Sequence, residues 1–573
     1  MNTQRGILHY SIPISLSIFA VLLAFSLFCS TGRDDSHITL WPAYTLSKYG
    51  SIVNYNGQNV EQSSSLLFVV LLAFIHKITG GHIVTLGWIL SLISGILCGI
   101  CAYLLFRRVV ISPFLKLSTP LILLNPFFAY WSFSGMETTL DALGVIIFVH
   151  ALYRGWAGAQ RYYLVHLFFT SLLFFAIRPE NIFISVFSVV LLAGLEWVTT
   201  RNSPGSYDLS KVGRILITLI LSAILLLIVR LVLFNAFLPQ PVYAKVGGNL
   251  LEMIGRGWIY FGVTIVSIPF IFILLPLLIA IVIHVRTGIL NKGALPIIYI
   301  YILVSGIFII TVGGDWMEAG RFFVPIIPLA MIVIIHMFNF IKWRYLRLIM
   351  IIGLLTGQVI GTIHVSVWQS TGRPIWTYHA ISNKIVGQSD PREYSFFEIA
   401  NRIHQRDLTV IPELSHIIET IREAKDEPLS ILSIQSGMVM FHTMLNHYGD
   451  VRFIDLYGLS TKDFTDCAIS SALPRKAGGI SLDYDLLFRS IDEYQTSCNL
   501  EPPDIIFDLD NVDFRRAQYL SENGYTVVYQ QSGNIKTGSI LEGGIVSGNE
   551  FIAINNEYSA LFLNTTKVVT LIQ

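Results

Sequence analysis

Two adjacent carboxylates, Asp34 and Asp35, stand at the start of a polar stretch in an otherwise apolar N-terminal part of the chain. They follow an apolar run over 11–30, and the polar stretch continues to Ser65. A carboxylate placed there can act as general base on a hydroxyl group. A pair can instead share a divalent cation (Mg, Mn or Ca), which takes oxygen ligands. A solvated turn or a helix cap is the alternative that involves no chemistry.

Two later stretches carry basic residues suited to an anion. Arg178 lies in an Arg-Pro-Glu-Asn stretch together with Glu180, and arginine binds phosphate oxygens bidentately. An interfacial arginine that reaches for the membrane surface is the equal alternative. Tyr243 and Lys245 belong to a Pro-Gln-Pro-Val-Tyr-Ala-Lys stretch and could hold a phosphate or a sugar. A simple aromatic anchor at the interface is the other interpretation.

The stretch 313–321, Gly-Gly-Asp-Trp-Met-Glu-Ala-Gly-Arg, is the most informative of the later ones. Its glycines permit a close approach of backbone and ligand. Trp316 can stack on a sugar or mark the interface. Asp315 and Arg321 add one charge of each sign, so this stretch also predicts a binding function.

Composition defines the class of protein that positions these residues. The chain is 53% hydrophobic and 13% charged, with a formal net charge of +1, which indicates a membrane protein and gives no sign of a nucleic-acid partner. Runs of about 20 apolar residues can each cross a bilayer as a helix. The expected spans are approximately 11–30, 83–106, 116–133, 136–155, 162–178, 181–199, 213–235, 258–285, 294–312, 322–342 and 345–366.

Basic residues gather in alternate gaps between these runs, which predicts that those gaps are cytoplasmic. The N-terminus is then cytoplasmic, and every motif-bearing loop lies on the external face. The apolar segment 66–78 is short for a span, and this topology requires it to lie along the outer surface or to re-enter.

Residues 1–366 are thus expected to form a polytopic transmembrane domain, and 367–573 a soluble α/β domain on the external side. Strands are predicted at 429–434, 452–456, 504–509 and 525–530, and helices at 437–445, 486–496 and 514–522. This alternation favours a small sheet that is at least partly parallel. Cys467 and Cys498 could form a disulfide in an oxidising compartment, with two unpaired thiols as the alternative.

The motifs together resemble the GT-C glycosyltransferases. The resemblance rests on the Asp-Asp loop continuing as YTLSKYGSIVNYNGQNVEQSSSLL, then SGMETTL, RPEN, PVYAK and GGDWMEAGRFFVPIIP. It is strongest towards the branch of terminal β-arabinofuranosyltransferases, which VRFIDLYGLSTKDF in the soluble domain also resembles. The run SSSLL and the Asn after Glu180 depart from the expected pattern and leave the sugar open.

The resemblance implies a polyprenyl-phosphate sugar donor, a glycan or glycolipid acceptor and a first-loop Asp as base, acting with inversion at the outer face of a bacterial cytoplasmic membrane. Phosphate is a good leaving group, so no general acid is needed, in contrast to glycoside hydrolysis. The donor site is expected to contain Arg178, Glu180, Tyr243, Lys245, Asp315, Trp316 and Arg321. Tyr44, Glu61 and Glu137 are expected to support the loop or to bind the acceptor.

Two other functions compete with this one. A transporter or flippase of a lipid-linked sugar would be expected to show internal repeats and polar sites in broken helices. The sequence has no recognisable repeat, and its polar groups lie in loops. A non-catalytic sensor that uses the soluble domain would leave the Asp-Asp and 313–321 stretches without a role.

Overall fold

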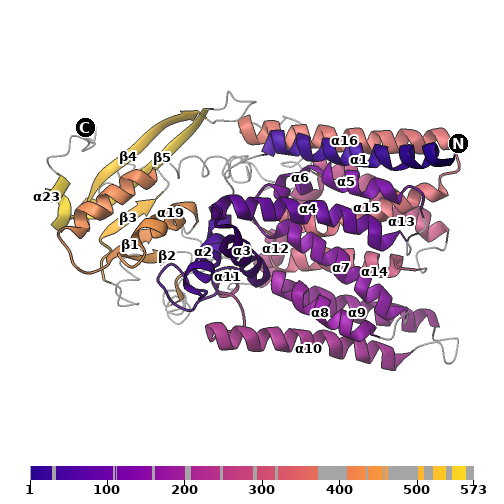
Figure 1. Cartoon of the computed structure of the whole chain (residues 1–573), viewed down its shortest axis with the longest axis horizontal. Helices are drawn as coiled ribbons and strands as arrows, with labels where there is room; N and C mark the ends of the chain where they lie inside the picture. The colour runs from indigo at the N-terminus through magenta and orange to yellow at the C-terminus, as the bar shows by residue number, and fades with distance from the viewer. Residues whose placement is uncertain are drawn as a thin grey trace.

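A computed structural model describes residues 2–28, 34–107, 110, 112–157, 162–200, 208–245, 250–266, 268–287, 293–315, 320–371, 410–433, 437–455, 458–462, 501–508, 520–536 and 545–562. The chain folds into a bundle of long helices with a sheet domain at one end (Figure 1). The N-terminus lies at the opposite end of the bundle from the sheet. Cys467, Cys498 and the predicted helix at 486–496 fall outside the described residues.

The bundle is built from helices that follow most of the expected spans. They are α1 (Asn2–Phe28), α4 (Ile83–Phe106), α7 (Thr138–Trp156), α8 (Tyr163–Ile177), α9 (Glu180–Thr200), α10 (Leu209–Phe234), α12 (Leu250–Val266), α13 (Ile268–Arg286), α14 (Leu295–Thr311), α15 (Ile327–Met337) and α16 (Arg344–Thr371). Short pieces connect them: η1 (Leu115–Leu117), α5 (Ser118–Leu123), α6 (Pro126–Ser132), α11 (Gln240–Lys245), η2 (Arg321–Ile326) and η3 (Phe338–Phe340).

One expected span is interrupted at a proline. The run 116–133 breaks between α5 and α6, where Asn125 caps α6 by accepting a hydrogen bond from the backbone N–H of Phe128, and Pro126 starts the helix. The run 258–285 is covered by α12 and α13. The break between α5 and α6 follows from proline chemistry, which a hydropathy window ignores.

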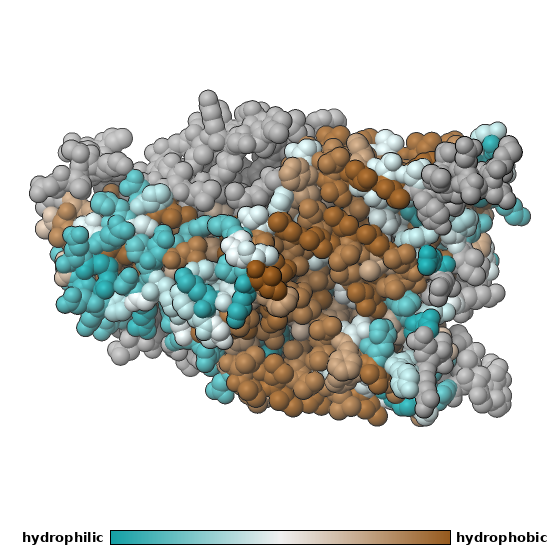
Figure 2. Space-filling view, in the orientation of Figure 1, coloured by the Kyte–Doolittle hydropathy of each residue, from teal (hydrophilic) through white to brown (hydrophobic). Residues whose placement is uncertain are grey.

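The bundle presents a broad apolar surface. Six of its helices are long and apolar enough to cross a membrane, judged by length and composition over the described residues. Figure 2 shows the corresponding hydrophobic band across the helices, with hydrophilic residues over the sheet domain. The chain is therefore a multi-pass membrane protein with a polar domain at one end.

The polar stretch after α1 was expected to be a loop. Its first half instead forms a helix, α2 (Asp34–Tyr49). Two acids in its first turn favour a helix start, since they face the positive end of the helix dipole. The segment expected to re-enter forms α3 (Leu66–Thr79), whose 14 residues extend only about 21 Å. A contact of 2.6 Å between Ser47 Oγ and His76 Nδ1 ties α3 to α2.

The sheet domain contains a five-stranded sheet with strand order β2-β1-β3-β5-β4. Its strands are β1 (Leu429–Ser433), β2 (Val451–Asp455), β3 (Ile505–Asp508), β4 (Tyr525–Lys536) and β5 (Ile545–Asn555), accompanied by α19 (Met438–His447), η5 (Asn556–Tyr558) and α23 (Ser559–Phe562). β1 pairs in parallel with β2 and β3, whereas β5 runs antiparallel to β3 and β4. This confirms the partly parallel sheet and the helix after β1.

The sheet domain docks on α2 and on the segment that follows it. The Asn56 side chain pairs with the backbone of Phe453, donating from Nδ2 over 2.8 Å and accepting at Oδ1 over 2.7 Å. The Trp41 ring lies 5.3 Å from that of Tyr448, centroid to centroid. Because α19 lies between α2 and the sheet (Figure 1), α2 is covered by the C-terminal sheet domain.

Candidate active site

A cavity of about 340 Å³ lies where the sheet domain meets the bundle, and it collects most of the motifs singled out in the sequence. Its walls come from the start of α2, segment 62–64, residues 136–137, 178–180 and 238–242, and the 313–321 stretch. We refer to it as the catalytic cavity. Segments from across the membrane domain thus converge on one cavity.

The start of α2 sends its two carboxylates to different places. Asp35 lines the catalytic cavity, whereas the Asp34 carboxylate accepts a hydrogen bond from the backbone N–H of Met438 at the start of α19. Successive side chains on a helix point about 100° apart, so adjacency in sequence separates them in space. A Cβ at Gly437 would collide with Asp34, which explains glycine at this close approach.

The surroundings of Asp34 change its acidity. Burial under α19, and secondly the charge of Asp35, raise the pKa of Asp34 to about 7, while the Met438 N–H opposes the increase. Desolvation disfavours the charged form of a carboxyl group. Asp34 therefore titrates near neutrality as part of an interface between domains.

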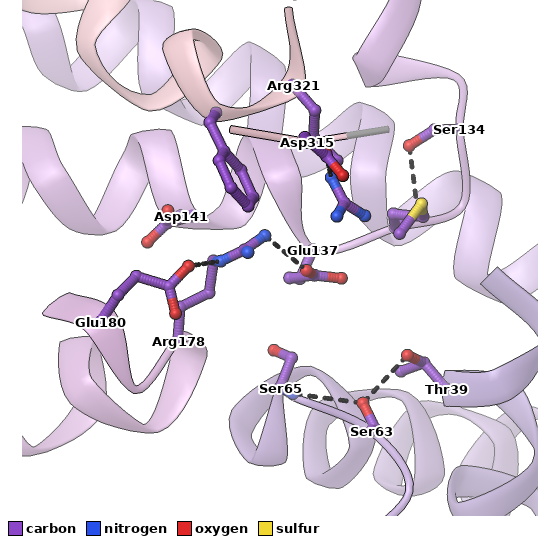
Figure 3. Close-up of polar contacts among 12 residues, drawn as sticks. Thr39, Ser63, Ser65, Ser134, Glu137, Asp141, Arg178, Glu180, Asp315 and Arg321 are labelled. Atoms are coloured by element: carbon purple, nitrogen blue, oxygen red, sulfur yellow. Dashed lines mark hydrogen bonds and ion pairs between the residues drawn. The ribbon is translucent and has the colours of Figure 1, made fainter. Parts of the chain in front are cut away.

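Arg178 occupies the opposite wall of the cavity between two carboxylates (Figure 3). Its Nε donates to Glu180, and its Nη1 donates to Glu137 over 3.0 Å. Asn181, the last residue of the motif, donates to Asp141 Oδ1 over 2.7 Å and fixes the start of α9. Arg178 is only 8% exposed, so it does not reach for the membrane surface as the alternative supposed.

Arg321 lies beside Arg178, at the start of η2. Its Nε donates to Asp315, and both guanidinium groups lie over the ring of Phe322, at 5.2 Å for Arg178 and 5.5 Å for Arg321. Gly314, with φ +71°, lets the backbone pass so close to Tyr260 that a Cβ would meet its ring. The described residues of this stretch, 313–315 and 320–321, thus bring the Asp315 carboxylate and the Arg321 guanidinium group to the cavity.

The floor of the cavity is tied to α2 by side-chain hydrogen bonds (Figure 3). Ser63 Oγ lies 2.9 Å from Thr39 Oγ1, and Gln62 Nε2 donates to the Ile38 carbonyl over 2.8 Å. Leu459 lines the same cavity from the sheet domain. The sequence analysis missed these residues, although the cluster Ser63-Ser64-Ser65 marked the segment.

Arg256 on α12 also lines the cavity and was missed. No described carboxylate forms an ion pair with it, in contrast to Arg178 and Arg321. Its sequence neighbourhood, an apolar helix with one exposed arginine, is equally typical of an interfacial helix. Only the fold could assign Arg256 to the site.

Several expected site residues lie elsewhere. The Tyr243 hydroxyl accepts from the Leu238 N–H over 3.4 Å and shapes its own turn, and Tyr44 packs on the α3 side of α2 against His76. Glu61 was expected to support the loop or to bind the acceptor. It forms a buried ion pair with Arg230 at 2.9 Å. The Lys245 side chain and Trp316 lie outside the described residues. Glu137, expected as support, is in the cavity with Arg178.

A metal site was one hypothesis for Asp34 and Asp35. The two carboxylates point to different surroundings, and no group of three or more His, Cys, Asp or Glu side chains in the described part of the chain has the arrangement of a metal site. The described residues therefore do not offer a ready-made cation site.

No protein-family model matches this sequence, and no curated protein is significantly similar to it. Comparison with solved structures gives clear similarities of fold. ArnT from Cupriavidus metallidurans in the apo state matches with a TM-score of 0.51 at 10% identity, over 96% of this chain and 98% of ArnT. ArnT bound to undecaprenyl phosphate matches with a TM-score of 0.52 at the same identity and coverage.

The archaeal oligosaccharyltransferase AglB from Archaeoglobus fulgidus matches with a TM-score of 0.47 at 12% identity, over 87% of this chain and 69% of AglB. The match to ArnT extends over nearly the whole length of both proteins and includes the bundle and the sheet domain. The chain therefore has the fold of ArnT, which is that of the GT-C glycosyltransferases.

Proposed function

We propose that this protein is a membrane glycosyltransferase that moves a sugar from a polyprenyl-phosphate donor to a glycan or glycolipid acceptor. The observation that carries the proposal is the meeting of Asp35 with Arg178 and Arg321 in one cavity between the bundle and the sheet domain. A carboxylate and two guanidinium groups are what this reaction needs, a base for the acceptor and cations for the departing phosphate.

In this proposal Asp35 is the base and Asp34 is not. The acceptor hydroxyl forms a bond to the anomeric carbon while Asp35 takes its proton. The bond from that carbon to the phosphate oxygen breaks, and the lipid phosphate leaves with the electron pair. A single displacement inverts the anomeric centre.

The guanidinium groups are held ready for the phosphate. Glu137 and Glu180 occupy Nη1 and Nε of Arg178, and Asp315 occupies Nε of Arg321. A guanidinium group has five N–H donors, so other N–H groups of both residues remain for a phosphate. The carboxylates thus orient the arginines, and Arg256 adds a third cation at the cavity.

The motif resemblance favours an arabinofuranosyl-type donor and transfer on the periplasmic side of a bacterial cytoplasmic membrane. This orientation places the sheet domain, the catalytic cavity and the acceptor outside. The lipid-linked donor would reach the cavity from the bilayer, beside the short helix α3.

The test compares isosteric variants of the two acids in the purified protein. Asp35→Asn should reduce sugar transfer by about a hundredfold to ten-thousandfold and leave binding of undecaprenyl phosphate unchanged, because the amide keeps the shape but accepts no proton. Asp34→Asn should keep most activity, since its amide oxygen still accepts from Met438. Full activity of Asp35→Asn would refute the proposal.

The same variants separate this function from a flippase. A transporter would move labelled lipid-linked sugar across proteoliposomes without forming a glycosidic bond. Transbilayer movement with no product, unchanged in Asp35→Asn, would favour that alternative.

A further inference from the structure

A second cavity, of about 320 Å³, shares segment 58–64 with the catalytic cavity as part of its lining. Gln58, Asn59 and Val60 line it, whereas residues 62–64 line the catalytic cavity. Its remaining walls are the C-terminal end of α10 at 232–235 and Lys462 of the sheet domain. Neighbouring residues of one segment therefore line both cavities.

A single turn of the sheet domain reaches both cavities. Leu459 lines the catalytic cavity, and Lys462, three residues later, lines the second. Side chains of the membrane domain donate hydrogen bonds to the turn on both sides of Leu459. Gln240 Nε2 donates to the Gly458 carbonyl over 3.0 Å, and Asn54 Nδ2 donates to the Ser460 carbonyl over 2.7 Å.

The turn is also fixed from within its own domain. The buried carboxylate of Asp455 accepts from the backbone N–H of Ser460 over 2.9 Å and from its hydroxyl over 3.1 Å. Preorganised binding groups lose little conformational entropy when a ligand arrives. A turn anchored in two domains is therefore suited to holding a ligand that extends from one cavity to the other.

The walls of the second cavity have the chemistry for an amphiphilic ligand. Gln58, Asn59 and Asn235 offer amides, which bind hydroxyl groups, and Lys462 is the one charged residue among the described lining residues. Val232 and Leu233, at the end of α10, are 78% and 46% exposed and form an exposed apolar side of the cavity. A polar, hydroxylated anionic headgroup with a lipid tail fits this combination.

Segment 58–64 contains one charged residue, Glu61, and this residue is paired. Glu61, which separates the residues of the two linings, is paired with Arg230 at 2.9 Å, and Arg230 is completely buried. The Arg230 charge is therefore neutralised within the wall, and Lys462 remains as the cation facing the second cavity. The three arginines of the catalytic cavity are available for the donor phosphate.

We infer that the second cavity is the acceptor subsite and that the acceptor is an amphiphile with an anionic headgroup, bound at Lys462 while its nucleophilic hydroxyl reaches Asp35 past Leu459. This inference rests on the proposed function. Lys462 and Leu459 then determine acceptor specificity without acting on the donor.

The test measures binding of two probes to the purified full-length protein in detergent by native mass spectrometry. Lysophosphatidic acid represents an anionic, hydroxylated amphiphile, and undecaprenyl phosphate represents the lipid carrier of the donor. Lys462→Gln should weaken binding of lysophosphatidic acid by about tenfold or more, the usual effect of losing a charge-assisted contact. It should leave binding of undecaprenyl phosphate unchanged. Lys462→Arg, which keeps the positive charge, should bind lysophosphatidic acid as the wild type does.

Controls make the outcomes distinct. Lys342→Gln, the same chemical change in the turn between α15 and α16, should alter neither probe, and equal unfolding temperatures should confirm intact folding. Equal losses for both probes in Lys462→Gln, or no preference of the wild type for lysophosphatidic acid over uncharged monoacylglycerol, would overturn the inference. If the wild-type protein did not bind undecaprenyl phosphate, that result would instead contradict the proposed function.

Discussion

The carboxylate of Asp34 accepts a hydrogen bond from the backbone N–H of Met438, a residue 404 positions further along the chain. This contact joins the start of α2, next to the first membrane helix, to the start of α19 in the sheet domain. The neighbouring Asp35 faces the catalytic cavity instead. One acid of the pair therefore joins the two domains, and the other lines the cavity in which we propose that it acts as the base.

Replacing Asp34 by alanine should loosen the docked sheet domain. The carboxylate acts as a cap for the first turn of α19, and loss of a helix cap costs about 0.5–2 kcal/mol. Hydrogen exchange at residues 438–441 should accelerate accordingly. Asp34→Asn, which keeps an acceptor oxygen, should protect these amides nearly as well as the wild type. Equal acceleration of exchange in both variants would show that the hydrogen bond from Met438 does not stabilise the docked sheet domain.

Docking should also depend on pH. The pKa of Asp34 is raised to about 7 by burial and by the charge of Asp35, so the docked state holds a proton that the undocked state, with its ordinary value near 3.8, releases. Stability of the docked state should therefore fall as pH rises from about 4 to about 7. The measurement is hydrogen exchange of α19 at pH 5 and pH 8, corrected for intrinsic rates.

Asp34→Asn is the control for this pH effect, since it cannot titrate. His37 on α2 and His442 on α19, whose rings lie 5.7 Å apart, are present in both proteins and contribute equally. The difference between the two proteins thus reports Asp34. A wild type as insensitive to pH as the variant would contradict the prediction.

Removing the Arg321 side chain should weaken binding of the lipid phosphate. Arg321→Ala loses a charge-assisted hydrogen bond, worth roughly 1.5–3 kcal/mol, and leaves Asp315 unpaired. Affinity for undecaprenyl phosphate should fall about tenfold to a hundredfold. Arg321→Lys should recover only part of it, because an ammonium group lacks the guanidinium fork. Unchanged affinity in Arg321→Ala would move phosphate binding to Arg178 and Arg256.

The fold was more predictable from sequence than the site. Apolar runs predicted the bundle, and the Asn125-Pro126 signal for the break between α5 and α6 was present but not used. The division of labour between Asp34 and Asp35 was not predictable, because it depends on where α19 lies. Leu459 and Arg256 carry no local signal either, since only docking and helix orientation bring them to the cavity.

The ion pair between Glu61 and Arg230 gives the last prediction. Arg230 has no exposed surface, and its Nε lies 2.9 Å from Glu61 Oε2. Glu61→Ala leaves a buried charge without its partner, a change that typically costs about 3–5 kcal/mol. The unfolding temperature in detergent should fall markedly, and segment 58–64 should lose protection from hydrogen exchange.

The double variant Glu61→Leu/Arg230→Leu should recover much of the lost stability, because apolar residues of similar size can replace a buried pair. A surface pair supplies the matched control. Arg214 and Asp208 lie 3.9 Å apart with side chains more than half exposed, so breaking that pair should change stability by at most about 1 kcal/mol. If Glu61→Ala were as mild as Asp208→Ala, the buried pair would not be what holds segment 58–64 in place.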